Sequence, residues 1–187
     1  MLCGDIESNP GPIDQNVYTV DILHLNVRSI RNKIENLLFL TSEFDILCFT
    51  ETHLDANILD RDLAIAGFST IFRKDKNCFC GGVKIYVPDS LKAMRRSDLE
   101  PPNTECIWIE ICNPTFNIFL CCIYGPPNSD SSFIENITCS LDKVSDISNH
   151  IIVLGDLNVN FLNMPISHKI HEIRLNFSLF NTISQNP

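Results

Sequence analysis

An aspartate and an asparagine two residues apart follow one of the most apolar segments of the chain. Asp156 and Asn158 come just after residues 151–154, whose apolar and mostly β-branched side chains predict a buried strand. The carboxylate can accept a proton from water, and the amide can donate to a phosphate oxygen. Open α/β sheets place their chemistry at the carboxyl ends of strands. The pair therefore indicates half of a hydrolytic site.

Three further apolar segments also end in polar side chains, which in chain order are Asn26, Glu51 and Tyr124. Taken singly, each has an ordinary explanation: a helix cap for the amide, a solvated loop for the acid and the sheet rim for the phenol. Asp156 and Asn158 could likewise form an Asx turn. Four such strand ends in one chain are hard to attribute to chance, and together they predict a single polar site.

The apolar patterns predict the elements that must position these side chains. Strands are expected at 20–26, 44–49, 81–87, 105–112, 117–124 and from 151 onward. Helices are expected after Ser29, acting as N-cap, and at 131–145 and 167–180, whereas 55–76 is expected to be mostly loop. Successive strands that lack an intervening helix favour a mixed-sheet α/β sandwich over a purely parallel doubly wound sheet.

Composition narrows the class of protein. The 187 residues suffice for one domain, and 44% hydrophobic with 20% charged residues is typical of a soluble globular chain. A net charge of −9 argues against tight non-specific binding of nucleic acid. It still allows a phosphodiester substrate if a divalent metal neutralises the site. No segment approaches the length of a membrane span, and the N-terminus lacks the apolar core of a signal peptide.

The nine cysteines favour free thiols over a disulfide framework or a zinc site. Cys48, Cys121 and Cys122 fall within apolar strand patterns, where a thiol behaves as a small hydrophobic group. The Cys78–Cys80 and Cys121–Cys122 spacings differ from the C-x-x-C of zinc sites. We expect reduced, mostly buried thiols in an intracellular protein.

Five motifs in this order resemble the endonuclease/exonuclease/phosphatase superfamily, and more narrowly the apurinic-type endonuclease domain of non-LTR retrotransposons. They are L-N-V-R-S-I-R-N-K, D-I-L-C-F-T-E-T-H-L, G-G-V-K-I-Y-V, C-C-I-Y-G-P-P and I-I-V-L-G-D-L-N-V-N-F. The resemblance covers about residues 18–187, and we assign the domain to 17–187. It implies the DNase-I-like fold: a four-layer α/β sandwich of two mixed β-sheets flanked by helices.

The resemblance also implies a role for each strand-end residue. Glu51 matches the acidic ligand of a divalent cation, Mg²⁺ with Mn²⁺ as the alternative. Asn26 matches the amide that orients Glu51 and the phosphate, and Tyr124 matches the phenol that hydrogen-bonds the phosphate. Asp156 matches the acid that positions or deprotonates water, and Asn158 matches the amide that stabilises the pentacoordinate transition state.

Two departures from the family pattern qualify this assignment. Arg28 stands where repair-type relatives have an aspartate that could bind metal, which fits the retrotransposon branch better. The family's terminal Ser-Asp-His element has no match, because no Asp follows Asp156 and neither His168 nor His171 lies in such a motif. The resemblance therefore implies a domain truncated at its C-terminus, with weak or no activity.

Residues 1–12 carry a separate motif. Asp5, Glu7 and the run Asn9-Pro10-Gly11-Pro12 complete D-x-E-x-N-P-G-P, which resembles a 2A-type ribosome-skipping peptide. The alternative is a Pro/Gly-rich disordered tail. Such peptides occur at the head of some retrotransposon reading frames, in agreement with the endonuclease resemblance.

The expected function is metal-dependent nicking of target DNA for retrotransposition, alongside a reverse-transcriptase domain. The expected location is intracellular, and nuclear if the full element is active. One alternative is a phosphatase of inositol phosphates or a sphingomyelinase. Another is a non-catalytic remnant or interaction domain. Six basic residues could flank a DNA groove or simply form solvated faces: Arg28, Arg31, Lys33, Arg73, Lys74 and Lys76. His53 is expected to have an ordinary loop role.

Overall fold

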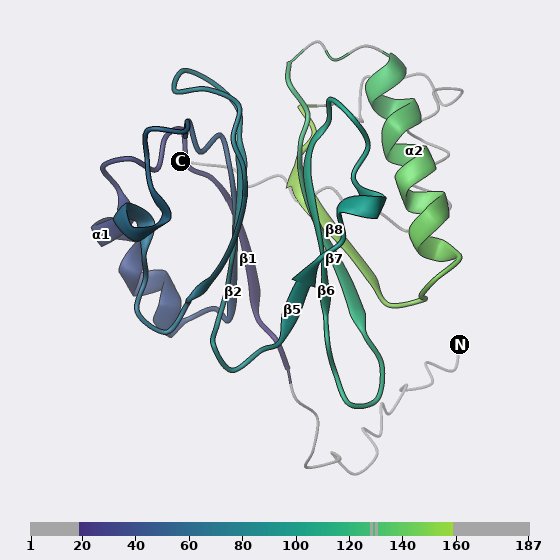
Figure 1. The fold of residues 1–187 in the computed structure, drawn as a ribbon, viewed down its shortest axis with the longest axis horizontal. Helices are drawn as coiled ribbons and strands as arrows, with labels where there is room; N and C mark the ends of the chain where they lie inside the picture. Colours follow the sequence, from purple (N-terminus) through teal and green to yellow (C-terminus); the bar gives the residue numbers. More distant parts are fainter. Residues whose placement is uncertain (1–18, 128, 130, 159–187) are drawn as a thin grey trace, which may run out of the picture.

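Two four-stranded β-sheets pack face to face in the computed structural model, which describes residues 19–127, 129 and 131–158 (Figure 1). The first sheet has the order β1-β2-β4-β3, with bounds Ile22–Asn26, Ile46–Thr50, Val83–Val87 and Thr70–Lys74. The second has the order β5-β6-β7-β8, with bounds Ala93–Arg95, Glu105–Ile111, Ile118–Tyr124 and Ile151–Asp156. The β1–β2 and β7–β8 pairs are parallel and the others antiparallel. The predicted mixed-sheet sandwich is confirmed.

Helical segments cover the outer faces of the two sheets (Figure 1). The helix α2, Ser131–Ser145, lies on the second sheet and matches the predicted range. Its apolar side chains recur at helical spacing, which buries one stripe against the sheet. The first sheet is covered by the short α1, Ile34–Leu37, and by the 3₁₀ segments Leu38–Ser42 and Asp60–Leu63. A further 3₁₀ turn spans Ser97–Leu99. Among the described helices, none is long and apolar enough to cross a membrane.

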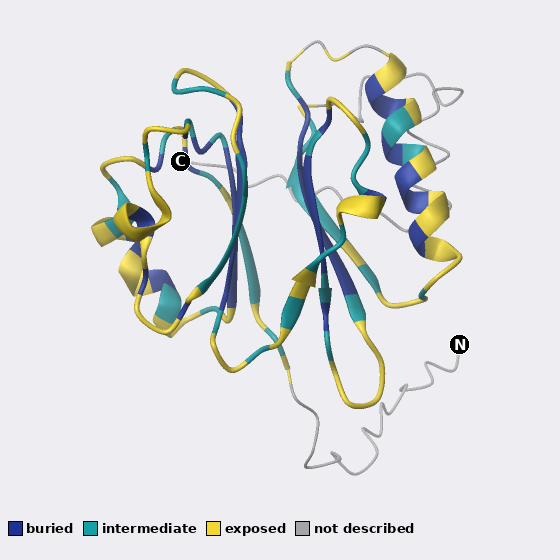
Figure 2. Cartoon of the chain, in the orientation of Figure 1, coloured by how far each residue is buried: buried dark blue, intermediate teal, exposed yellow. Residues whose placement is uncertain are grey.

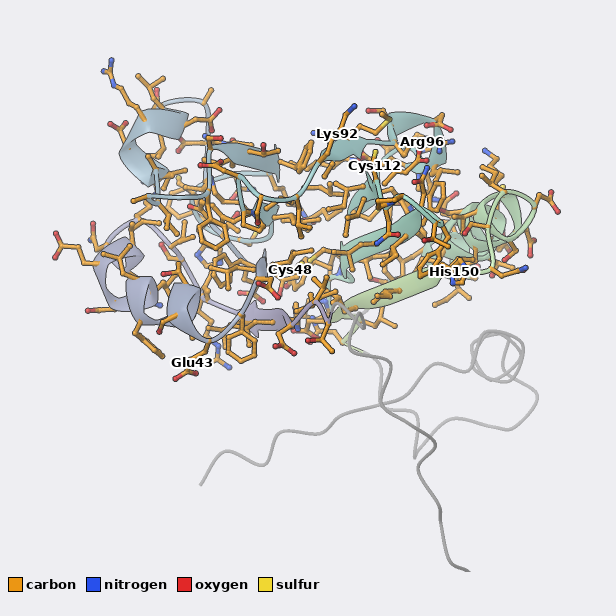
Figure 3. The ribbon with its side chains drawn as sticks, turned by 90° about the horizontal axis from the view of Figure 1, so that it is seen from below. Glu43, Cys48, Lys92, Arg96, Cys112 and His150 are labelled. Atoms are coloured by element: carbon orange, nitrogen blue, oxygen red, sulfur yellow. The ribbon has the colours of Figure 1, made fainter. Side chains whose placement is uncertain are left out.

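Apolar side chains form a layer between the sheets and one on each outer face (Figure 2). The strands β4, β6 and β7 are buried on both faces, which explains their nearly continuous apolar sequences. Cys48, Cys121 and Cys122 are buried as predicted, and the described cysteines are all free. Figure 3 shows Cys48 inside the sandwich and Glu43 at its surface.

Two edge strands correct the prediction that residues 55–76 are mostly loop and extend the set of strands. β3 lies within that stretch, and among the described strands it pairs only with β4, as the three-residue β5 pairs only with β6. An edge strand is exposed on one side, so polar residues such as Arg73 and Lys74 interrupt its apolar pattern.

Ser29 is not the predicted helix N-cap. Its φ is 81°, and its amide donates to the Glu51 carbonyl at 2.8 Å. The flanking amides of Val27 and Ile30 donate to the Thr50 and Thr52 carbonyls, both at 3.0 Å. Segment 27–30 therefore runs alongside the end of β2, and the helix begins only at Ile34. The predicted helix at 167–180 and residues 1–12 lie outside the described residues.

Candidate active site

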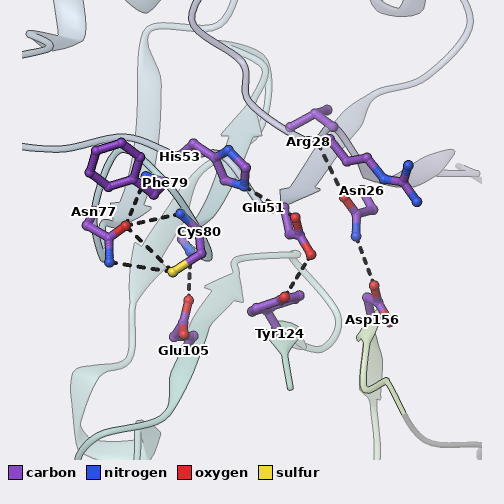
Figure 4. Close-up of polar contacts among 12 residues, drawn as sticks. Asn26, Arg28, Glu51, His53, Asn77, Phe79, Cys80, Glu105, Tyr124 and Asp156 are labelled. Atoms are coloured by element: carbon purple, nitrogen blue, oxygen red, sulfur yellow. Dashed lines mark hydrogen bonds and ion pairs between the residues drawn. The ribbon is translucent and has the colours of Figure 1, made fainter. Parts of the chain in front are cut away.

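The parallel strand pairs bring the predicted polar residues to one end of the sandwich. Asn26 pairs in register with Thr50, and Tyr124 pairs with Asp156, so each pair of strands ends at the same level. The strand β1 contacts β8 and β2 contacts β7 across the two sheets. The four strand ends therefore meet, as Figure 4 shows for Asn26, Glu51, Tyr124 and Asp156.

The Asp156 carboxylate is held by two amides from different parts of the chain. The Asn26 side-chain Nδ2 donates to Oδ2 of Asp156 at 2.9 Å, joining the first sheet to the second (Figure 4). The Asn158 backbone N–H donates to Oδ1 at 3.0 Å. The Asn158 side chain donates in turn to the Gly125 carbonyl at 2.8 Å. Both oxygens of the acid are thereby oriented, and each keeps room for another hydrogen bond.

Gly155 allows β8 to approach β7 closely enough to deliver Asp156. Its φ is 144°, a value that residues with a side chain rarely adopt. A Cβ added at this position would lie 1.9 Å from the Ile123 carbonyl oxygen. The Gly-Asp sequence at the strand end is thus a packing requirement as well as a chemical motif.

The Glu51 carboxylate lies beside this pair and accepts two hydrogen bonds. Tyr124 donates its hydroxyl proton to Oε1 at 2.7 Å, and His53 Nε2 lies 3.2 Å from Oε2 (Figure 4). Glu51 and His53 both have φ of 52°, a left-handed conformation uncommon for residues other than glycine. Backbone strain of this kind persists where surrounding contacts enforce it and is frequent at functional sites. Here it turns the acid toward Tyr124.

These contacts shift the ionisation of the site. Partial burial opposes ionisation of Glu51, but the hydrogen bonds from Tyr124 and His53 and the Asn26 amide outweigh it and lower its pKa. Burial, followed by the hydrogen bond to Glu51 and then the negative charge of Glu51, raises the pKa of Tyr124. Burial also lowers the pKa of His24, whose Nε2 lies 3.1 Å from the Thr50 hydroxyl. At neutral pH the site therefore presents an ionised Glu51 and a protonated phenol.

The donor set at Glu51 fits a magnesium-like cation. Such a cation accepts one or two protein carboxylates and keeps several waters. Glu51 is ionised, is 23% exposed, and has lone pairs left after its two hydrogen bonds. Within the described part of the chain no group of three or more His, Cys, Asp or Glu side chains could form a closed metal site. The arrangement suits a cation with an open coordination sphere rather than structural zinc.

All five predicted site residues come together, and two further ones join them. The structure places the side chain of His53 on Glu51, contrary to the expected loop role, and places His24 behind the strand ends. A sequence signal for His53 exists in the spacing Glu51-Thr52-His53, because residues two apart share a side of an extended chain. The observed backbone differs from that geometry, since Glu51 and His53 are both left-handed. The assigned roles of these residues stay predictions.

Comparison with known proteins gives a likeness of structure. No family model and no curated protein matches the chain. The endonuclease domain of TRAS1, a telomere-specific non-LTR retrotransposon, matches with a TM-score of 0.58 and 17% identity, over 77% of this chain and 61% of that one. AP endonuclease LMAP from Leishmania major matches with a TM-score of 0.62 and 19% identity, over 75% and 55%.

A third structure, the 3′ phosphatase NExo from Neisseria bound to a product DNA hairpin, matches with a TM-score of 0.50 and 17% identity, over 75% of this chain and 58% of that one. The chain thus spans 55% to 61% of the length of these three structures. At such identities the likeness concerns the fold. The chain has the two-sheet α/β sandwich of DNase-I-like domains.

Proposed function

We propose that this chain carries the site of a metal-dependent phosphodiesterase that nicks DNA. One observation carries the proposal: the Asn26–Asp156 hydrogen bond of 2.9 Å joins the two sheets beside a Glu51 held by Tyr124 and His53. An acid that can take a proton, next to an ionised acid that can hold a cation, is what hydrolysis of a phosphodiester requires. The names of the structural neighbours, which include nucleases, support the same reaction class.

The proposed reaction assigns a step to each residue. Asp156 accepts a proton from water, the water oxygen bonds to phosphorus, and the bond from phosphorus to the 3′ oxygen breaks. The leaving oxygen takes a proton from solvent. A second N–H of the Asn158 amide is available to a phosphate oxygen, where negative charge develops. Because its hydroxyl donates to Glu51, Tyr124 acts as a positioning residue for that carboxylate.

Glu51 would hold the Mg²⁺ or Mn²⁺ ion, which supplies positive charge to the phosphate when bound. The product of the nick is a free 3′-hydroxyl, a primer for DNA synthesis. We propose that it primes a reverse transcriptase in the nucleus, as in a non-LTR retrotransposon. The resemblance of residues 1–12 to a 2A-type peptide, with Asn9, Pro10, Gly11 and Pro12 at its end, supports the same origin.

Nicking of supercoiled plasmid in Mg²⁺ tests the proposal. Glu51→Gln removes the charge that holds the cation, and Asp156→Asn removes the proton acceptor. Each is expected to lower the rate at least about 100-fold, because each removes a group that acts on the transition state. Asp98→Asn is the matched control, since Asp98 pairs with Arg96 away from the site, and it should nick like wild type.

Three outcomes contradict the proposal in different ways. Unchanged nicking by Glu51→Gln or Asp156→Asn would remove these residues from the chemistry. Hydrolysis of an inositol phosphate or sphingomyelin without nicking would assign the site to the alternative substrates. A cooperative melt with no hydrolysis of any of these substrates would indicate a non-catalytic interaction domain.

A further inference from the structure

Arg28 differs from the other basic side chains near the site. Of the six predicted to flank a DNA groove, five are engaged by partners within the protein. These partners are Asp55 for Arg31, the Val27 and Arg28 carbonyls for Lys33, Asp60 and Asp75 for Arg73, Glu100 for Lys74 and Glu105 for Lys76. Within the described part of the chain, no hydrogen bond or ion pair reaches the Arg28 guanidinium. Its charge is therefore available to a ligand.

The backbone holds Arg28 in one strained conformation. Its φ is 44°, and it lies between the Val27 and Ser29 amides that donate to the end of β2 at 3.0 and 2.8 Å. Lys33 reaches back to the Val27 and Arg28 carbonyls at 2.5 and 3.1 Å. Val27 and Ile30 are buried on either side, whereas Arg28 is exposed. Backbone strain that is enforced at an exposed, charged residue indicates that the direction of its side chain matters for function.

That direction is along the Asp156 side of the site. The Arg28 backbone N–H donates to Oδ1 of Asn26 at 3.3 Å, and the same Asn26 donates to Asp156. In Figure 4 the Arg28 side chain extends past Asn26, on the side away from Glu51. In that view the Arg28 guanidinium and the Glu51 carboxylate, which would hold the cation, lie on opposite sides of the Asn26–Asp156 pair.

We propose that Arg28 binds a substrate phosphate adjacent to the one that is cleaved. The inference rests on the proposed hydrolysis of DNA. A strand that crosses the site presents phosphates on both sides of the scissile one, and Arg28 extends on the side away from the Glu51 carboxylate. A guanidinium donates two parallel hydrogen bonds to phosphate oxygens. It thereby orients the DNA strand and neutralises the charge of one phosphate. Arg28 thus supplies a positive charge beside the site in a chain of net charge −9.

Binding of a fluorescein-labelled DNA duplex, followed by anisotropy in EDTA over a salt series, tests the inference without catalysis. Arg28→Gly is expected to raise Kd about tenfold, as for loss of a charged hydrogen bond. It should also reduce the slope of log K against log salt by about 0.9, the value for one phosphate contact. Glycine suits a φ of 44°, so the variant should melt no lower than wild type. The Kd of Arg28→Lys should lie between those of the wild type and Arg28→Gly.

Arg61→Gly is the matched control, because Arg61 is 80% exposed and pairs only loosely with Asp62 at 3.7 Å. It should leave Kd and the salt slope unchanged. In steady-state nicking, Arg28→Gly should raise KM about tenfold and change kcat less than threefold, because its phosphate is not the reacting one. A lower kcat at unchanged KM would overturn the assignment.

The binding and nicking results separate this inference from the proposed function. If the wild type nicks DNA but Arg28→Gly binds it with an unchanged Kd and salt slope, only the Arg28 assignment is overturned. Absence of nicking by wild type, with weaker and less salt-dependent binding by Arg28→Gly, would overturn the proposed hydrolysis and leave Arg28 as a phosphate contact.

Discussion

The Tyr124 hydroxyl connects the ionisation of the site to its geometry. It donates a hydrogen bond to Oε1 of Glu51, with 2.7 Å between the two oxygens, and this bond helps to lower the pKa of the carboxyl against the effect of partial burial. Tyr124→Phe should therefore raise the pKa of Glu51. The acidic limb of the nicking rate should move to higher pH, because the ionised acid is then lost sooner as pH falls. Nicking at neutral pH should fall about tenfold. Carboxyl NMR titration of the metal-free protein measures the pKa directly.

Tyr86→Phe provides the control for this change. Tyr86 is also buried and donates its hydroxyl proton, but to the Leu63 carbonyl at 2.7 Å on the outer face of the first sheet. Its loss should lower stability by about 1 kcal/mol and leave the titration of Glu51 unchanged. An unmoved Glu51 pKa in Tyr124→Phe would mean that the phenol does not hold the carboxylate in solution.

At the scale of elements, the pairing of β7 with β8 depends on Gly155. Gly155→Ala adds a Cβ that would lie 1.9 Å from the Ile123 carbonyl, so β8 must move away from β7. The expected loss is about 3 kcal/mol in the free energy of unfolding. Because Asp156 follows directly, nicking should fall as well. The midpoint of urea unfolding measures the stability.

Gly67→Ala separates steric contact from backbone strain. Gly67 has a φ of 82° and nothing within 4 Å of an added Cβ. It should lose only about 1 kcal/mol, the cost of a left-handed conformation for alanine. Equal losses in the two variants would show that close packing of β8 on β7 does not constrain this position.

Sequence predicts an element where its burial leaves a regular apolar pattern. The strands β4, β6 and β7 are buried on both faces and α2 on one stripe, so each leaves a clear apolar pattern. The edge strand β3 leaves none, because half of its surroundings are solvent. The prediction of Ser29 as a helix N-cap is wrong because backbone contacts between segment 27–30 and the end of β2 override its capping signal.

The site shows the same division between local and long-range information. Strand ends place Asn26 and Asp156 at the sheet rim, and this much follows from pattern alone. Their hydrogen bond joins residues 130 positions apart, and it exists only because the two sheets pack with β1 against β8. The His53 contact forms with Glu51 and His53 both in left-handed conformations, which the spacing of the two residues does not encode.

At the scale of the whole molecule, Lys84 makes the stability of the protein vary with pH in the alkaline range. Its side chain is fully buried on β4, and within the described residues its ammonium has no hydrogen-bond partner. The ring of Tyr86, 4.8 Å away, offsets little of this. Burial, followed by repulsion from Arg73, lowers the pKa of Lys84 to about 8. Keeping the charge at neutral pH therefore opposes folding.

Lys84→Met should stabilise the protein at pH 7 by about 2–3 kcal/mol, since it removes a buried charge and keeps the apolar stem. The sign of the pH dependence follows from proton binding: between about pH 8 and 10.5 the unfolded chain holds the Lys84 proton more tightly than the folded one. Wild-type stability therefore gains on that of the variant as pH rises, and the difference should vanish near pH 10.5. Other groups that titrate in this range, including the buried thiols, contribute equally to both proteins and cancel.

Urea unfolding at pH 7 and 10.5 measures the difference in stability between wild type and Lys84→Met. The control is Lys92→Met, a change at an exposed lysine, which should match wild type at both pH values. A stability difference that is the same at both pH values would show that Lys84 is uncharged or solvated in the folded protein.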